Sequence, residues 1–229
     1  MVNATSHADL EAFALAVLKS GENLVCRTAA SFVNAIIGQR PADLLQKNDL
    51  GNNRKTGGLI VIGSYVPKTT AQLNILKNNY AAEYMELDVD GLFTDANLET
   101  TLKQKAALLD AFLEQGKNVV VYTSRKVKTG SNKEESLAIV NVVSQALTKL
   151  VEMIGVQPQF ILAKGGITSS DIAVKSLKIQ RARVLGQLIK GVPVWQADEK
   201  SKFPSIPYIV FPGNVGSDYD LYNALKKLE

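Results

Sequence analysis

Short apolar runs alternate with longer helical segments from residue 59 onward. Four short runs are strand-like, and three of them are almost continuously apolar and end sharply, as strands of a buried parallel sheet do. They lie at residues 59–62, 83–88, 118–122 and 160–163. Three intervening segments carry apolar residues at helical spacing, at about 69–79, 95–114 and 133–154. This alternation predicts an α/β fold of three layers, a mostly parallel sheet with helices on both faces.

The pattern changes after residue 180. Residues 184–189 and 192–195 are strand-like and predict a hairpin or an antiparallel edge, where Pro193 is tolerated. A further apolar run at 208–211 precedes a last amphipathic segment with leucines at 221, 225 and 228. These residues extend the same sheet and its helical layers.

The first 45 residues form a separate pattern. Residues 2–4 and 24–26 predict short strands, and helices are expected from the N-cap candidates Thr5 and Ser6 to Gly21 and over 29–37. These elements bury too little apolar surface to fold alone, so we expect them to pack on the rest of the chain or on an absent domain.

The polar segment 46–58, rich in glycine and asparagine, is the clearest domain boundary. We therefore predict a small N-terminal α/β part over residues 1–45 and a larger domain over 46–229.

A glycine turn follows the strand at 160–163. Gly165 and Gly166 permit a close approach to the main chain, and Thr168, Ser169 and Ser170 are N-cap candidates for the next helix, with Asp171 at capping-box spacing from Thr168. Ile172, Val174 and Leu177 are expected to face inward in that helix. Unpaired amides and the positive end of a helix dipole attract phosphate.

Two other strands end in similar turns. Gly63 and Ser64 follow the first strand, and a Pro-Gly-Asn-Val-Gly turn over 212–216 follows the last. After the first turn, Thr69 and Gln72 have capping-box spacing. Three such turns at the carboxyl edge of one parallel sheet form a ligand site, whereas the alternative is three ordinary βα loops.

Composition narrows the class of protein. The net charge is +4 and the pI about 9.0, but the charge is spread along the chain, so nucleic acid is not an expected partner. The densest basic patch, residues 125–128 with Lys133 beyond it, is either a solvated loop or a collar for an anion. Cys26 is the only cysteine, which fits a reducing cytoplasm, and no apolar run of membrane-spanning length occurs.

Individual polar residues carry weaker signals. His7 is the only histidine and has no nucleophile or second metal ligand at a recognisable spacing, so we interpret it as a surface residue, and no metal site is predicted. Asp88 and Asp90 either hold a metal ion or a ribose hydroxyl or cap the next turn. Trp195 is interpreted as a packing residue. No GxGxxG with a following acidic residue appears, which disfavours a dinucleotide-dependent dehydrogenase.

Six segments together resemble one known family. They are CRTAASFV, VIGSYVPKTTAQL, VVVYTSR, GGITSSDIAVKSL, RVLGQLIKGVPVW and FPSIPYIVFPGNVG. In combination they resemble the C-terminal portion of the four-carbon acid sugar kinase family, some members of which are labelled Hrp-dependent type III effector. The resemblance covers essentially the whole chain.

The resemblance implies a function and a set of contacts. Family members are two-domain kinases in which an N-terminal domain holds threonate, erythronate or 3-oxo-tetronate and a C-terminal domain holds ATP, used with Mg²⁺. Their nucleotide contacts fall here on residues of the three turns, which are Ser64, Gly165, Gly166, Ile167, Thr168 and Gly213, with Asn214 and Gly216 in the last turn. Arg27 is a candidate contact for the sugar acid, and no catalytic base is identified.

One departure from the family limits the expected activity. The aspartate-rich DDxTG motif that opens the family's substrate domain is absent, and residues 1 to about 45 match only the tail of that domain. The chain resembles a fragment or one half of a split kinase, for which we expect nucleotide binding without efficient turnover. The alternative is an interaction or regulatory module that no longer binds nucleotide. Whether it forms a homo-oligomer stays open.

Overall fold

The computed structural model describes residues 2–40, 42–51, 54–125 and 130–229. The chain divides into two compact units, Met1–Asp43 and Leu44–Glu229. None of the helices in the described residues is long and apolar enough to cross a membrane.

Unit 2 is built on a seven-stranded sheet. Its strands are β1 (Leu59–Ile62), β2 (Glu83–Leu87), β3 (Val119–Thr123), β4 (Ile161–Lys164), β5 (Ala182–Ile189), β6 (Val192–Ala197) and β7 (Pro207–Phe211). Their order is β2-β3-β1-β4-β7-β6-β5. The first five strands in this order are parallel, whereas β6 pairs antiparallel with both β7 and β5. The predicted α/β class and the predicted hairpin are confirmed.

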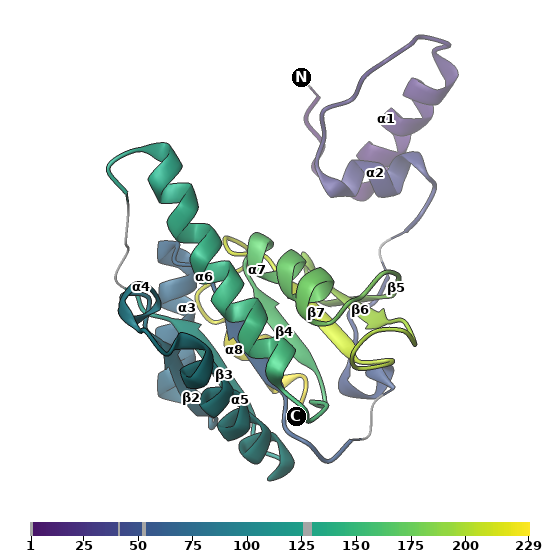
Figure 1. Cartoon of the computed structure of the whole chain (residues 1–229). Helices are drawn as coiled ribbons and strands as arrows, with labels where there is room; N and C mark the ends of the chain where they lie inside the picture. The colour runs from purple at the N-terminus through teal and green to yellow at the C-terminus, as the bar shows by residue number, and fades with distance from the viewer. Residues whose placement is uncertain (1, 41, 52–53, 126–129) are drawn as a thin grey trace. The chain divides into compact units, whose positions relative to one another are not determined.

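Helices cover both faces of this sheet (Figure 1). They are α3 (Pro67–Asn79), α4 (Gly91–Thr94), α5 (Leu98–Glu114), α6 (Lys133–Met153), α7 (Gly166–Asp171) and α8 (Asp220–Lys226), with a 3₁₀ turn at Lys47–Leu50 and a π-helical turn at Ile172–Ser176 that continues α7. Helices α5, α6 and α7 lie on one face, and α3 and α8 on the other. Crossover connections between parallel strands produce this three-layer arrangement.

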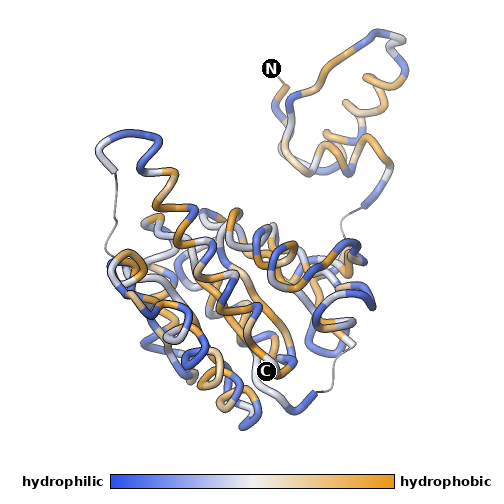
Figure 2. The backbone as a smooth tube through the Cα atoms, viewed as in Figure 1, coloured by the Kyte–Doolittle hydropathy of each residue, from blue (hydrophilic) through white to orange (hydrophobic). Residues whose placement is uncertain are grey.

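Strand alternation divides the core into two clusters. Leu59 and Val61 of β1 face the α5 and α6 side, whereas Ile60 and Ile62 face the α3 and α8 side, and all four are fully buried. Figure 2 shows hydrophobic residues along the central strands. Because both faces of β1 are covered, its sequence is apolar throughout rather than alternating.

Two helices begin earlier than the sequence predicts. Helix α3 has Val66 as N-cap and Pro67 in its first turn, so Thr69 and Gln72 form no capping box. Helix α7 begins at Gly166, and the three hydroxyl residues predicted as caps lie inside it. In both cases a proline or glycine already sets the backbone for helix entry, and the polar side chains bind elsewhere.

The inward face of the α7 segment is only partly as predicted. Ile172 and Leu177 are fully buried, but Val174 is 60% exposed. The π-helical turn at Ile172–Ser176 has more residues per turn than an α-helix, so the residues within it depart from the expected helical period.

Unit 1 contains α1 (His7–Lys19) and α2 (Ala30–Ile36). Ser6 and Asp9 form a capping box at the start of α1, and the rings of Phe13 and Phe32 lie 5.6 Å apart between their centroids. The predicted strands at 2–4 and 24–26 are wrong, since neither segment forms a strand in the described residues. The described residues of unit 1 include no strand that could pair with them, and this part is therefore helical rather than α/β as we expected.

Candidate functional site

Three glycine-containing turns meet at the carboxyl edge of the sheet. They follow β1, β4 and β7, which are neighbours in that order. Ser64 contacts both other turns, because an ideal Cβ on Gly165 would lie 3.0 Å from the Cβ of Ser64 and one on Gly213 would lie 3.0 Å from its Oγ. The structure thus brings together turns that are far apart in sequence.

The turns after β1 and β4 lead to opposite faces of the sheet. Helix α3, which follows β1, packs on the α8 side, whereas α7, which follows β4, packs on the α6 side. Two adjacent parallel strands whose connections diverge leave a crevice outside their carboxyl ends, where open α/β sheets bind ligands.

A cavity of about 500 Å³ lies at this position. Main chain and hydroxyl groups from the turns line one part of it, and aliphatic side chains of α6 line another. The α6 residues are Leu137, Ile139, Val140, Val143, Ser144 and Leu147. A volume of this size accepts a nucleotide-sized molecule, and an apolar wall beside a few convergent polar groups is typical of small-molecule sites.

Backbone amides are available where α7 begins. The amide of Gly165 donates to the carbonyl of Phe211 at 2.8 Å, which continues the sheet pairing by one residue. The amides of Gly166, Ile167 and Thr168 occupy the first helical turn, where no intrahelical acceptor exists. All three residues line the cavity.

Gly165 and Gly166 differ in whether the fold tolerates a side chain at their position. Gly165 has φ of +116° and lies against Ser64, so a side chain there is strained by both backbone and space. Gly166 has no atom within 4 Å of an ideal Cβ. A side chain at 166 is therefore tolerated by the fold and projects into open space beside the cavity.

Arg125 fixes the turn after β1 to the end of β3. Its guanidinium donates to the carbonyl of Ser64 at 2.7 Å and to both the carbonyl and the hydroxyl of Thr123. Partial burial lowers the pKa of Arg125. Arg125 is the only member of the predicted basic patch 125–128 that can be assigned a role, because residues 126–128 lie outside the described residues.

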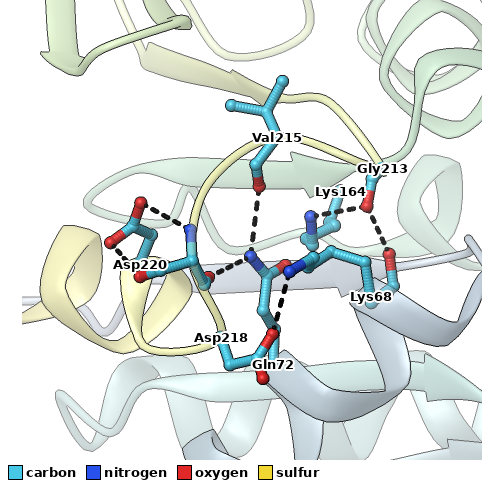
Figure 3. A network of polar contacts seen from close by, with 9 residues as sticks. Lys68, Gln72, Lys164, Gly213, Val215, Asp218 and Asp220 are labelled. Atoms are coloured by element: carbon cyan, nitrogen blue, oxygen red, sulfur yellow. Dashed lines mark hydrogen bonds and ion pairs between the residues drawn. The ribbon is translucent and has the colours of Figure 1, made fainter.

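The opposite side of the β7 turn is filled by a polar network (Figure 3). Thr69 Oγ1 donates to the carbonyl of Gly213 at 2.9 Å, and Gln72 Nε2 donates to the carbonyls of Val215 and Ser217 at 3.1 and 2.8 Å. The ammonium of Lys164 donates to the carbonyls of Pro212 and Gly213 at 2.8 and 3.2 Å. The loop after β7 is thereby held against α3 and β4.

Seven of the eight predicted nucleotide-binding residues line the cavity. They are Ser64, Gly165, Gly166, Ile167, Thr168, Gly213 and Asn214. Gly216 is not among the lining residues and lies beside the carboxylate of Asp220. Arg27 lies in unit 1, exposed on the segment between α1 and α2.

Sequence reasoning missed the apolar wall and Lys164. The apolar residues at 133–154 do not reveal the wall, because a stripe that lines a cavity has the same period as one that packs against a sheet. Lys164 ends an otherwise apolar strand and occupies the inward position next in alternation after Leu162. A lysine at an inward position of an apolar strand is the sequence signal that could have identified it.

The carboxylate of Asp88, directly after β2, acts as a cap, whereas Asp90 occupies the N-cap position of α4 without a side-chain cap bond. Asp88 accepts hydrogen bonds from the amides of Asp90 and Gly91 at 3.2 and 3.0 Å, which favours the capping interpretation. No group of three or more His, Cys, Asp and Glu side chains placed to hold a metal ion occurs in the described part of the chain. His7 lies on α1, 3.5 Å from the carboxylate of Glu11.

Comparisons with known proteins agree with this geometry. Residues 59–221, well over half of the chain, match the family described as nucleotide-binding C-terminal domain. No curated protein matches the chain.

Three solved structures share the fold. A Haemophilus influenzae protein of the DUF1537 family has 21% sequence identity to this chain and a TM-score of 0.66. The match includes 100% of this chain and 53% of that protein. A Salmonella typhimurium LT2 protein, named as a candidate tRNA synthase, has 14% sequence identity and a TM-score of 0.69. The match includes 99% of this chain and 52% of that protein. A Bordetella bronchiseptica DUF1537 protein, solved with citrate as a domain-swapped dimer, has 16% sequence identity and a TM-score of 0.59. The match includes 98% of this chain and 52% of that protein. The chain spans about half the length of these proteins.

Proposed function

The chain belongs to the family of nucleotide-binding C-terminal domains, and from that premise we propose that unit 2 binds ATP. The observation that carries the proposal is the cavity in which three glycine-containing turns and an apolar helix face converge. Family membership supports nucleotide binding as such, and the choice of ATP rests on the resemblance to sugar-acid kinases.

The cavity divides into two chemically distinct parts. The amides of Gly166 to Thr168, with Ser64 and Gly213 opposite, would hold the phosphates, since exposed main-chain amides bind phosphate oxygens. The aliphatic side chains of Val140 and Val143 on α6 would pack against the base and ribose. We therefore place the triphosphate at the turns and the nucleoside along α6.

The reaction that we propose is phosphoryl transfer from ATP to a hydroxyl of a four-carbon sugar acid such as threonate, erythronate or 3-oxo-tetronate. Such catalysis consists mostly of positioning and charge stabilisation around the γ-phosphate, normally with Mg²⁺. The described carboxylates form no cluster for this ion, so Mg²⁺ would arrive bound to the phosphates, as it commonly does. This chain contributes the amides and hydroxyls that orient the nucleotide.

We propose that residues 1–45 are the final part of a sugar-acid-binding domain and that Arg27 faces the acid. Support comes from the resemblance of this segment to the tail of the kinase substrate domain. The chain covers about half of the similar solved proteins, so the acceptor site would be completed by a further domain, in the same chain or in a partner. Self-association belongs to the same proposal, since the Bordetella protein is a domain-swapped dimer. Exposed, free Cys26 fits a reducing cytoplasm.

Isothermal titration calorimetry with Mg-ATP tests nucleotide binding. We expect saturable binding to the wild-type chain and a loss of at least about tenfold in affinity for Gly166→Val, roughly 1.4 kcal/mol, because the added side chain occupies ligand space without meeting protein atoms. Gly155→Val, in the turn after α6 and outside the cavity lining, is the matched control.

Two outcomes contradict the proposal. Folded wild-type protein that gives no heat with millimolar Mg-ATP favours the alternative, an interaction module without nucleotide. Equal affinities of the wild type and Gly166→Val place the nucleotide elsewhere.

A further inference from the structure

Lys164 is a fully buried lysine directly before the Gly165 turn. Lysine is seldom completely buried, because its ammonium loses hydration in the interior. Its ammonium is held by the carbonyls of Pro212 and Gly213 and lies 4.1 Å from the centre of the Phe211 ring. Gly213 lines the cavity, so the charge lies one peptide group behind the cavity wall.

The charges around Lys164 do not neutralise it. Lys68 on α3 adds a second positive charge, and its ammonium pairs with Asp218 at 3.1 Å. Asp220 at the start of α8 accepts hydrogen bonds from the amide and hydroxyl of Ser217. Figure 3 shows these groups around the β7 turn. Among the described residues, no carboxylate forms an ion pair with Lys164.

We propose that Lys164 is a positioning residue of the nucleotide site, which holds the Gly213 turn in its binding conformation and supplies a buried positive charge beneath the phosphates. This inference rests on the proposed nucleotide function. On this inference, the buried ammonium of Lys164 has no carboxylate partner because the bound phosphates supply the negative charge. Such a charge acts strongly on a nearby anion, since the interior screens it less than water does.

The protonation state of Lys164 then controls affinity. Burial, with the neighbouring charge of Lys68, lowers the pKa of Lys164 to about 7. A bound phosphate favours the charged ammonium, so nucleotide binding raises this pKa, and affinity falls as the pH rises above about 7. The phosphates of ATP are already ionised in this range, since their second pKa is about 6.

Stability depends on pH in the opposite sense. Above about pH 7 the unfolded chain holds a proton on Lys164 that the folded chain has released, so this group makes stability rise with pH up to its ordinary pKa. Lys164→Met removes the buried charge and keeps an unbranched apolar chain. We expect the variant to remain folded, because replacing a buried charge by an apolar group is often neutral or stabilising.

The test measures Mg-ATP affinity by calorimetry across the range from about pH 7 to about pH 9. We expect the wild-type affinity to fall about tenfold over this range, because the protonated fraction falls steeply above the pKa. Lys164→Met should bind at least about tenfold more weakly at the lower pH and show no such slope. Lys68→Met, which removes a partly exposed and already paired cation of the same network, should keep the slope and move it to higher pH, because a charge that lowers the pKa of Lys164 is gone.

The outcomes separate this inference from the function on which it rests. If the wild type binds Mg-ATP and Lys164→Met has the same affinity or the same pH slope, the inference is overturned and the proposal of nucleotide binding stands. A slope that is absent in Lys68→Met, rather than moved to higher pH, also overturns it. Absence of wild-type binding at every pH overturns the proposed function and the inference together. Unfolding curves of both variants confirm that the compared proteins are folded.

Discussion

The two faces of the sheet differ sharply at the carboxyl edge. On the α6 side, a cavity of about 500 Å³ lies between the turns and the side chains of Val140 and Val143. On the α3 side, the buried side chains of Thr69, Gln72 and Lys164 fill the corresponding space and donate hydrogen bonds to the loop after β7. The same loop is therefore open to a ligand on one side and fixed on the other.

This difference explains how a turn stays ready for binding. Carbonyls of the β7 loop accept hydrogen bonds on the filled side, and these bonds restrain the loop without a ligand. A binding site that is formed in advance does not lose affinity to the cost of ordering its loops. We expect substitutions on the filled side to act mainly on stability, and those on the open side mainly on binding.

The largest contrast is expected between Phe211→Ala and Val143→Ala. Phe211 is fully buried in the cluster on the α3 side, so its truncation should lower the free energy of unfolding by about 3–5 kcal/mol. Val143 is half-buried at the cavity, and its truncation should cost less than about 1 kcal/mol while weakening nucleotide binding. Urea titrations measure the first effect and calorimetry the second. Equal losses of stability in the two variants would contradict the comparison.

A smaller loss is expected for Gln72→Met. This variant keeps the side-chain length but removes the donor to the carbonyls of Val215 and Ser217, of which only that of Ser217 keeps another donor, the amide of Asp220, so the loss should cost about 1–2 kcal/mol in urea unfolding. Asn74→Met, at an exposed position of the same helix, is the control and should have little effect. A Gln72→Met protein as stable as this control would show that the network does not hold the loop.

The smallest effect is expected for Asp218→Asn. Lys68 and Asp218 form an ion pair at 3.1 Å whose side chains are 39% and 51% exposed, so its loss should cost less than about 1 kcal/mol. Thermal unfolding at low and high salt measures this contribution. The difference from wild type should shrink as salt is added, because screening weakens an exposed pair. A salt-independent loss above this size would assign Asp218 a structural role beyond the pair.

Much of the fold follows from local sequence. The strand at 59–62 was predicted at its observed bounds, because four apolar residues between polar and glycine segments leave no other assignment. The prediction that three turns gather at one edge needed only a parallel sheet. Helix starts were less accurate, since Thr69 and Ser169 are cap candidates in the sequence yet lie inside their helices, where their hydroxyls donate to main-chain carbonyls. Ser169, for example, donates to the carbonyls of Ala163 and Gly165.

What the sequence did not reveal depends on tertiary contacts. Spacing does not distinguish a leucine of α6 that faces a cavity from one that faces a strand. The burial of Lys164 depends on β7 and α3, which are distant in sequence. The strands expected in unit 1 had suitable residues but no partner within that unit, and Val25 is fully exposed. Pairing, not propensity, decides such short segments.

The amide of Gly165 donates to the carbonyl of Phe211, so the turn that meets the cavity is an extension of the β4 and β7 pairing. These residues are separated by most of the C-terminal quarter of the chain, and Ser64 is more distant still. The site that we propose for the phosphates is consequently completed only when the last strand, β7, has docked. Nucleotide recognition would thus depend on the folding of strands that are widely separated in sequence.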